Sequence, residues 1–438
     1  MKKILVYSHD AYGLGNIRRM LEITNHLVNS DPELSVLLIS GSPMLHEFRI
    51  PDRVDYIKLP CVARSEKGET YVKTLGISYQ DTISLRAHLI MMAVVDFDPD
   101  LILVDKKPFG IADELGLALR VMRDQGRKPR CVLLLRDILD EPEATIRQWE
   151  KGNYHDAIKE YYDQVLVVGS ENVFDAAREY CFPETTARKV RYCGYIRRPA
   201  PRKSPQRVRE DFGLRTDRPL VLVTAGGGGD GYEMMEAYLR GVANQPHRQF
   251  ETLLISGPEM SNRQREALFE MAAQVDGVVF HEFTDDMISC MNAADVVVSM
   301  GGYNTVCELL SLKKRMIIVP RVDPVAEQWM RAERMQNLGL LRAIHPDELT
   351  PESLLEAIED ELDQGAGRAH ALSQFAMDGL ARIGHEIATL MAPRKEAVGG
   401  SVIRINRGRA RVASFTHAMR PRESLAGLIG ALGNAAGA

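Results

Sequence analysis

The sequence predicts an α/β protein made of two doubly wound, Rossmann-like domains that face each other across a cleft. Short runs rich in Val, Ile and Leu alternate with helical segments, and near-continuous apolar strands of this kind are typical of parallel sheets covered on both faces. This alternation of strands and helices starts at the N-terminus and starts again in the second half of the chain, which indicates two domains. At 438 residues the chain is also too long for one hydrophobic core.

The predicted strands of the first half each end in a polar or glycine residue. They are 2–10, 34–40, 100–105, 130–137 and 164–170. Helical patterns separate them, and the first helix follows the glycine-bearing turn "AYGLGN". The second half repeats the arrangement with strands in 219–224, 250–257, 278–283, 294–302 and 315–321. Ligands in such sheets bind beyond the carboxyl ends of the strands, so residues just after each strand are the candidates for function.

A Pro- and Arg-rich stretch, 196–213, is expected to link the two domains. We therefore predict an N-terminal acceptor-side domain over 1–198 and a donor domain over 199–392, closed by helices with apolar residues at helical spacing. From Pro393 the chain is Gly-, Ala- and Arg-rich without a period, which predicts a poorly ordered basic tail over 393–438. A solvated tail is favoured over one that touches an anionic membrane.

Composition excludes several classes of protein. The net charge of −5 argues against a nucleic-acid partner, which would need a strongly basic face. The six cysteines form no C-x-x-C pair, so neither a zinc site nor a disulfide framework is expected. The N-terminus is interpreted as a strand, and no apolar window approaches the roughly 20 residues of a membrane span. We expect a cytoplasmic protein, with peripheral contact at the inner membrane face as an alternative.

The stretch "VTAGGGGDG", 223–231, follows a predicted strand and opens a helix. Its glycines, Gly226, Gly227, Gly228 and Gly229, let the backbone approach a phosphate, and amides at a helix start face an anion. It is neither a Walker A loop nor a good dinucleotide fingerprint. A flexible turn is the alternative, but four consecutive glycines exceed what a turn requires, and we predict that the loop binds a diphosphate.

The stretch "SMGGYNTVCELL", 299–310, places polar residues in an otherwise apolar helix. Gly301 and Gly302 end a strand, Thr305 falls in the first turn of the helix, and Glu308 lies about one turn further on the same face. A hydroxyl and free amides suit a phosphate, and a carboxylate suits two vicinal ribose hydroxyls. The pattern predicts a nucleotide site, whereas Glu308 taken alone would be an ordinary surface residue.

The second half resembles the donor domain of GT-B glycosyltransferases, specifically the family-28 (MurG-like) group. The matching segments are "TAGGGGDG", "FTDDMISCMNAADVVVSMGGYNTVCELLSLKKRMIIVPR" and "EQWMRAERMQNLGL". The resemblance spans roughly 215–345. It implies that the segment Gly301–Glu308, with Asn304 and Thr305, holds the α-phosphate and ribose. It also implies that Glu327 and Gln328 reach the donor sugar and that the loop around Phe283 lies against the base.

The stretch "VYSHDAYGLGNIRRMLEI" resembles the first acceptor-domain loop of an uncharacterised bacterial branch of these enzymes. Gly13, Gly15 and Asn16 would belong to the binding loop, but the family pattern has a histidine where this chain has Asn16. Asparagine cannot shuttle a proton near neutral pH, so that role does not carry over.

Other polar groups at strand ends are candidates for the catalytic base. They are His9, Asp10, Asp105 and Asp137. Instead of acting as the base, Asp105 could simply pair with Lys106. For Asp137, we expect Arg136 to be the partner. Arg18 and Arg19, at the start of the first helix, are expected to clamp an anionic acceptor or the leaving diphosphate, with a solvated helix face as the alternative.

Together these patterns predict a glycosyltransferase that moves a sugar from a nucleotide-diphosphate donor, with UDP-sugar as the default, to an acceptor hydroxyl. The resemblance implies an inverting displacement, in cell-surface, exopolysaccharide or glycolipid biosynthesis. Loop amides and helix dipoles can do the work of a cation, so we expect the reaction to be metal-independent. The acceptor would be a sugar, a lipid-linked sugar or a polysaccharide, and no cofactor is expected because the nucleotide sugar is a substrate. The alternatives are a nucleotide-sugar hydrolase, a 2-epimerase, or a binding protein without turnover.

Overall fold

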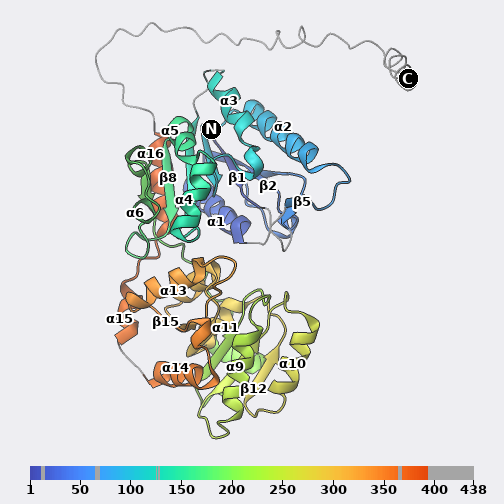
Figure 1. The fold of residues 1–438 in the computed structure, drawn as a ribbon, viewed down its shortest axis with the longest axis vertical. Coiled ribbons are helices and arrows are strands. Elements are labelled where there is room, and N and C mark those ends of the chain that lie inside the picture. Colours follow the sequence, from blue (N-terminus) through green and yellow to red (C-terminus); the bar gives the residue numbers. More distant parts are fainter. Residues whose placement is uncertain (11–14, 65–69, 125, 127–128, 364–366, 393–438) are drawn as a thin grey trace, which may run out of the picture. The chain divides into compact units, whose positions relative to one another are not determined.

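The computed structural model describes residues 1–10, 15–64, 70–124, 126, 129–363 and 367–392, and the described residues belong to one compact unit. Figure 1 shows its two sets of strands with their covering helices. The predicted tail and Gly13 lie outside the described residues. The α/β class and the two parallel sheets are confirmed.

The first sheet has seven parallel strands in the order β3-β2-β1-β6-β7-β8-β9. Their bounds are β1 Lys2–Ser8, β2 Leu34–Ser40, β3 Val54–Lys58, β6 Leu101–Asp105, β7 Arg130–Arg136, β8 Gln164–Val168 and β9 Val190–Tyr192. Alternate residues of β1 point to opposite faces: Ile4 and Val6 join one buried cluster, and Leu5 and Tyr7 join another. Both faces are therefore covered, as the continuous apolar strands predicted. A separate antiparallel pair joins β4 Val62–Arg64 to β5 Thr70–Val72.

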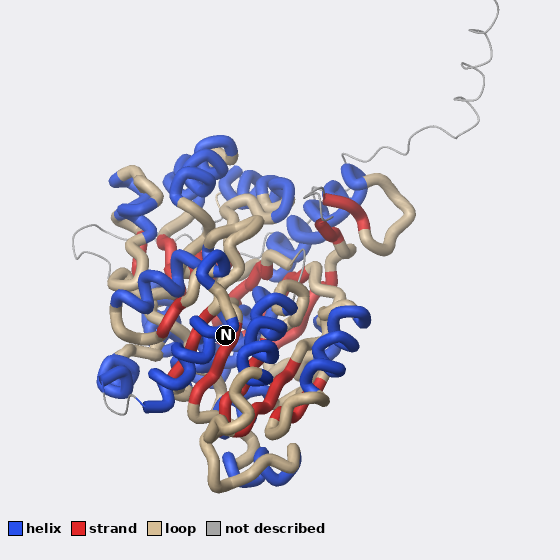
Figure 2. Tube along the Cα trace, turned by 60° about the horizontal axis from the view of Figure 1, so that its bottom comes forward, coloured by secondary structure: helices blue, strands red, loops and turns tan. Residues whose placement is uncertain are grey.

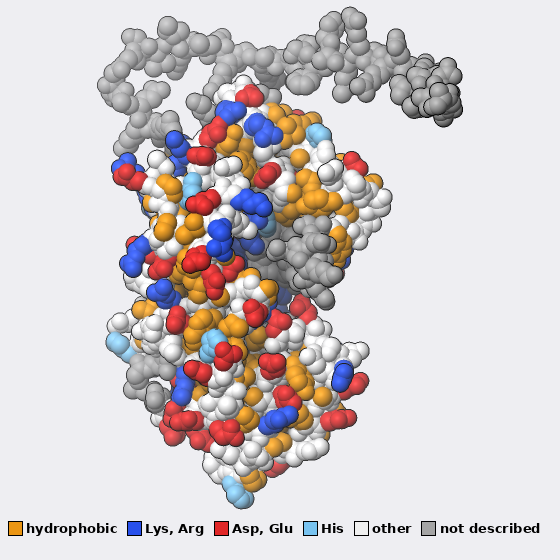
Figure 3. Space-filling view, in the orientation of Figure 1, with side chains coloured by type: hydrophobic (Ala, Val, Ile, Leu, Met, Phe, Trp, Pro, Cys, Tyr) orange, Lys and Arg blue, Asp and Glu red, His pale blue; other side chains and the backbone are white. Residues whose placement is uncertain are grey.

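The helices of the first half lie between these strands. They are α1 Gly15–Ser30, η1 Leu45–Glu47, α2 Tyr79–Phe97, η2 Ile111–Asp113, α3 Gly116–Asp124, α4 Pro142–Lys151, α5 Tyr154–Tyr161, α6 Ala176–Glu179 and α7 Glu184–Ala187. Helix α2 buries Ile90 and Val94. It also leaves Leu85, Leu89 and Met92 exposed, and Figure 3 shows apolar side chains gathered where this helix lies.

The second sheet has six parallel strands in the order β12-β11-β10-β13-β14-β15. Their bounds are β10 Leu220–Thr224, β11 Glu251–Ile255, β12 Val278–His281, β13 Val296–Ser299, β14 Arg315–Ile318 and β15 Arg342–Ala343. The remaining helices are α8 Pro205–Asp211, α9 Tyr232–Ala243, α10 Asn262–Ala272, α11 Met287–Ala293, α12 Tyr303–Ser311, α13 Glu327–Asn337, η3 Pro346–Glu348, α14 Pro351–Asp363, α15 Gly367–Gln374 and α16 Gly379–Met391. In Figure 2 the strands run between helices.

The predicted linker, 196–213, is partly a helix. Ser204 caps α8, because its Oγ accepts a hydrogen bond from the backbone amide of Arg207 at 3.2 Å, and Pro205 occupies the first turn. Proline is favoured at this first helical position, where its missing N–H costs no hydrogen bond. The stretch expected to link the two domains therefore contains a helix over Pro205–Asp211.

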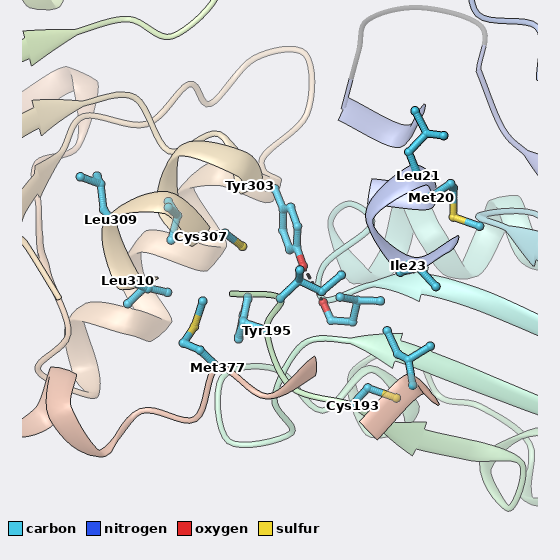
Figure 4. Close-up of a cluster of buried hydrophobic side chains, with 14 of the residues drawn as sticks. Met20, Leu21, Ile23, Cys193, Tyr195, Tyr303, Cys307, Leu309, Leu310 and Met377 are labelled. Carbon is cyan, nitrogen blue, oxygen red and sulfur yellow. Dashed lines mark hydrogen bonds between the residues drawn. The ribbon is translucent and has the colours of Figure 1, made fainter. Parts of the chain in front are cut away.

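The last described helix, α16, returns to the first half of the chain. It packs on α1, and Gln164 of β8 donates a hydrogen bond to Glu386 of α16 at 2.6 Å. A buried cluster also includes side chains of both halves; in Figure 4, Tyr303 extends from α12 and its hydroxyl donates to the carbonyl of Val168 at 3.2 Å. These contacts tie the edge of the first sheet to the start of α12.

Candidate functional site

The loop between β10 and α9 is a glycine turn that no other residue could form at its centre. Gly228 has φ = 100°, and a Cβ there would lie 2.5 Å from the carbonyl oxygen of Ser256. The Glu259 amide donates to the Gly227 carbonyl at 2.7 Å and holds the turn against the segment after β11. The turn lies between a strand and a helix, as the sequence predicted.

The start of α12 lies beside this turn. A Cβ placed on Gly226 would be 3.6 Å from the Oγ1 of Thr305, in the first turn of α12. Gly302 precedes the helix and provides no side-chain cap, which leaves the first amides of α12 without that partner. Two predicted phosphate-binding segments, about 75 residues apart in sequence, therefore meet at one place.

The first-half glycine segment reaches the same place. A Cβ on Gly15, the first residue of α1, would lie 3.3 Å from Asn304 Nδ2. Arg198 connects the same elements, since its guanidinium donates to Asn304 Oδ1 at 2.6 Å and to Glu22 of α1 at 2.8 Å. The structure thus brings Gly15, Gly226, Asn304 and Thr305 together.

A cavity of about 620 Å³ opens next to this junction. Its lining residues are Arg18, Leu21, Glu22, Asn25, Phe48, Arg49, Pro51, Arg198, Pro199, Ile288 and Glu308. The carboxylate of Glu308 is half-buried and, among the described residues, has no hydrogen bond or ion pair. Burial raises the pKa of Glu308, although the charges of Arg198 and Arg18 oppose the shift. A half-buried carboxylate without a partner at a cavity is suited to accept hydrogen bonds from a ligand.

Arg18 and Phe283 differ in their relation to this cavity. Arg18 lines it, in keeping with the predicted anion contact. The side chain of Phe283 is 60% exposed and is not among the lining residues. Its proposed contact with a base stays a prediction.

The start of α13 lies against the first sheet. Glu327 forms ion pairs with Arg136, at 3.2 Å, and with Arg331, also at 3.2 Å. Burial opposes ionisation, but the charges of these two arginines lower the pKa of Glu327. Gln328 is also buried, and its Oε1 accepts from the Arg321 amide at 3.1 Å. A Cβ on Gly301 would lie 3.1 Å from Gln328 Cβ, so Gln328 borders the glycine pair before α12.

Asp137 is bound by a residue that the sequence analysis did not single out. Arg331 of α13 donates to both oxygens of Asp137, at 2.7 and 3.0 Å, and to the Gly301 carbonyl at 3.1 Å. Tyr195 adds a hydrogen bond to Asp137 at 2.9 Å. The expected partner of Asp137, Arg136, pairs with Glu327 instead, so that expectation was wrong. The spacing of Glu327 and Arg331, four residues apart on one helix, was the local signal available.

Asp105 is also held in an ion pair. Arg19 donates to its Oδ1 at 2.6 Å, and the His9 amide donates to its Oδ2 at 3.4 Å. The alternative pairing with Lys106 is therefore replaced by one with Arg19. Arg19 is only 2% exposed and points to Asp105, so its expected role as a clamp facing the cleft was wrong.

Both polar atoms of the Asn16 side chain form hydrogen bonds within the protein. Its Nδ2 donates to the His9 carbonyl at 2.7 Å, and its Oδ1 accepts from Arg19 at 3.3 Å. The asparagine thus fixes the backbone directly after β1. Its amide connects α1 to the end of that strand.

His9 and Asp10 differ from the other two candidates because each has a buried atom without a partner. Asp10 accepts from Ser40 at 2.6 Å through Oδ2, while its Oδ1 and the Nδ1 of His9 have no hydrogen-bond partner. Burial raises the pKa of Asp10. Burial, with the charges of Lys106 and Lys107, lowers the pKa of His9 well below its ordinary value. Unpaired buried polar atoms are costly and are expected where a ligand binds.

The described part of the chain has neither a metal-binding cluster of side chains nor a membrane-spanning helix. No group of three or more His, Cys, Asp or Glu side chains in it is arranged to hold a metal ion. No helix in those same ranges is long and apolar enough to cross a membrane.

The fold defines the class of protein. A solved MurG of Acinetobacter baumannii superimposes with a TM-score of 0.55 at 15% identity, covering 89% of this chain and 99% of that one. A solved UDP-N-acetylglucosamine 2-epimerase, described as putative, from Listeria monocytogenes gives a TM-score of 0.62 at 14% identity, over 89% and 96% of the two chains. The chain has the GT-B fold, as the sequence predicted.

The sequence comparisons show what the chain is similar to. Residues 220–383 match the glycosyltransferase family 28 C-terminal domain. An uncharacterised glycosyltransferase of Methanopyrus kandleri is 28% identical over 207 residues, which are 47% of this chain and 56% of the relative. The UDP-N-acetylglucosamine–N-acetylmuramyl-(pentapeptide) pyrophosphoryl-undecaprenol N-acetylglucosamine transferase of Clostridium kluyveri is 27% identical over 34% of this chain and 40% of its own length. The chain thus spans about half, or less, of the curated relatives that it matches.

Proposed function

We propose that the protein transfers a sugar from a nucleotide-diphosphate donor, with a UDP-sugar as the first choice, to an acceptor hydroxyl. The observation that carries this proposal is the meeting of the Gly226–Gly229 turn with the start of α12, beside a cavity lined by the unpaired Glu308. The turn and the helix amides suit a diphosphate, and Glu308 suits ribose hydroxyls. The family-28 match covers these segments.

The same arrangement accounts for the departure of the nucleotide. Negative charge develops on the diphosphate as the bond to the sugar breaks, and fixed amides at a helix start stabilise such charge without reorganising. Direct attack by the acceptor on the opposite side of the sugar would invert its configuration. We propose this inverting displacement, with the backbone amides in the place that a metal ion takes in other enzymes.

We propose Asp10 as the base that takes the proton of the acceptor hydroxyl. Asp105 and Asp137 are engaged in ion pairs with Arg19 and Arg331, respectively, which leaves them less suited to take a proton. The lowered pKa of His9 makes it a weaker base, whereas the raised pKa of Asp10 makes its carboxylate a stronger one than usual. Its free Oδ1 is the acceptor for the proton.

A 2-epimerase or a hydrolase of the same fold is the second candidate, since the Listeria monocytogenes structure, described as a putative 2-epimerase, shares the fold. These reactions need no sugar acceptor. Incubation with donor alone separates them from a transferase, because a hydrolase releases free sugar and an epimerase changes the donor sugar. A protein that only binds the donor would do neither, even with an acceptor present.

The proposal is tested by thermal stability in the presence of UDP, GDP, ADP, dTDP or CDP and their common sugar conjugates. A ligand that binds only the folded protein raises its melting temperature by mass action. We expect a rise with one nucleotide family, with and without magnesium. A folded protein that responds to none of them would contradict the proposal.

A further inference from the structure

Three neighbouring strands of the first sheet end in basic or polar residues that the donor site does not use. In the strand order β1-β6-β7, His9 and Lys106 directly follow β1 and β6, and Arg136 is the last residue of β7. Neighbouring strands lie about 4.8 Å apart, so the three side chains share one edge of the sheet. This edge carries the carboxyl ends of the strands, where ligands of parallel sheets bind.

Most carboxylates at this edge are held in ion pairs. Asp105 is neutralised by Arg19, and Asp137 by Arg331. Glu327 is shared by Arg136 and Arg331. The ammonium of Lys106, a half-buried residue, has no hydrogen bond or ion pair within the described part of the chain.

Two further features of this edge are typical of a ligand-binding site. The Nε of Arg136 and the Nδ1 of His9 are buried without a partner. Lys106 has φ = 71°, a left-handed backbone conformation that is unfavourable for a lysine and recurs at functional sites. Burial, with the repulsion of Arg136, lowers the pKa of Lys106 to about 8, and Lys106 contributes in turn to the lowered pKa of His9.

We propose that Lys106 and Arg136 bind an oxyanion, a phosphate or a carboxylate, carried by the acceptor. The inference rests on the proposed function and narrows it to acidic acceptors. The pair lies on the first sheet, whereas the turn and helix proposed for the donor diphosphate lie on the second sheet. Glu327 contacts Arg136, so the anion would bind next to the residues predicted to reach the donor sugar.

The test uses calorimetric titration of the full chain with inorganic phosphate and with D-glucuronate, each with and without saturating UDP. UDP occupies the donor phosphate site and leaves the proposed one open. The variants are Lys106→Gln and Arg136→Gln, and the matched control is Lys151→Gln, an exposed lysine on α4. UDP affinity is measured for every protein. Lys106→Gln also removes a charge that repels its neighbours, so this variant is expected to fold.

We expect one of the two anions to bind the wild type in the presence of UDP. The affinity should fall about tenfold or more in each variant, as the loss of a charged hydrogen bond predicts, and stay unchanged in the control. The anion that binds distinguishes an acceptor that carries a phosphate from one that carries a carboxylate.

Absence of binding, or equal binding by the variants, would overturn the proposal. A parallel loss of UDP affinity would also overturn it, because the pair would then belong to the donor site. Failure of UDP to bind the wild type counts against the proposed function, and the titrations without UDP still decide the anion site.

Discussion

Replacing Arg331 by methionine should cost about 3–5 kcal/mol of unfolding free energy, the range measured when one partner of a buried ion pair is removed. Arg331 is fully buried. It holds both oxygens of Asp137, and its loss leaves that carboxylate with only the Tyr195 hydroxyl as a side-chain partner. In the variant, Glu327 retains its ion pair with Arg136. Most of the expected cost is therefore the uncompensated charge of Asp137.

Urea unfolding followed by fluorescence and circular dichroism measures this cost, and agreement of the two probes tests whether the transition is two-state. The matched control is Arg334→Met on the same helix, since Arg334 is 42% exposed and pairs with Glu179 at 3.3 Å. That substitution should cost about 0–1 kcal/mol. Adding Asp137→Asn to Arg331→Met should recover part of the loss, because the buried charge is removed.

The pH dependence of the cost has a definite sign. Burial disfavours the ionised form of Asp137, but the charge of Arg331 outweighs it and lowers the pKa. The stabilisation is therefore complete above the ordinary pKa of an aspartate, about 4, and is lost as the pH falls through the lowered value. The difference between wild type and Arg331→Met should accordingly shrink below about pH 4. A variant as stable as Arg334→Met at pH 7 would refute this account of Arg331.

Two further substitutions test the base and the glycine turn. Asp10→Asn should reduce turnover by about 10²–10⁴-fold, the usual contribution of a general base, while UDP affinity stays the same; exposed Asp96→Asn is the control, and a wild-type rate in Asp10→Asn would exclude Asp10 as the base. Gly228→Ala forces a Cβ to 2.5 Å from the Ser256 carbonyl at φ = 100°, so it should lower the melting temperature and weaken UDP binding. Gly76→Ala, where a Cβ meets nothing within 4 Å, should do neither, and equal behaviour of the two alanine variants would contradict the predicted role of the turn.

Local features of the fold could be predicted from the sequence. Apolar runs with polar ends identify buried parallel strands, and the order of strand, glycines and helix locates both the turn after β10 and the start of α12. Helix α8 was missed because the Pro- and Arg-rich composition of 196–213 was interpreted as that of a linker. The pair Ser204–Pro205, a cap followed by proline at the first helical position, was present in the sequence and predicts a helix start.

Ion pairs between distant residues could not be predicted in this way. Asp137 and Arg331 are 194 residues apart, and Arg19 and Asp105 are 86 apart. No local pattern selects the partner of a buried carboxylate over such separations, because the choice depends on how the sheets and helices pack. The same limit applies to Lys106, which was considered only as a partner for Asp105. Its unpaired charge becomes evident only once Arg19 is placed.

The most direct test of the account is the affinity of UDP for the wild type and for Glu308→Ala, measured by calorimetry. Glu308 lines the cavity without a partner of its own, so its loss should weaken UDP binding by about 1–3 kcal/mol. Exposed Glu333→Ala on α13 removes the same charge and should bind UDP as the wild type does. Equal affinity in a folded Glu308→Ala variant would contradict the nucleotide site proposed at the start of α12.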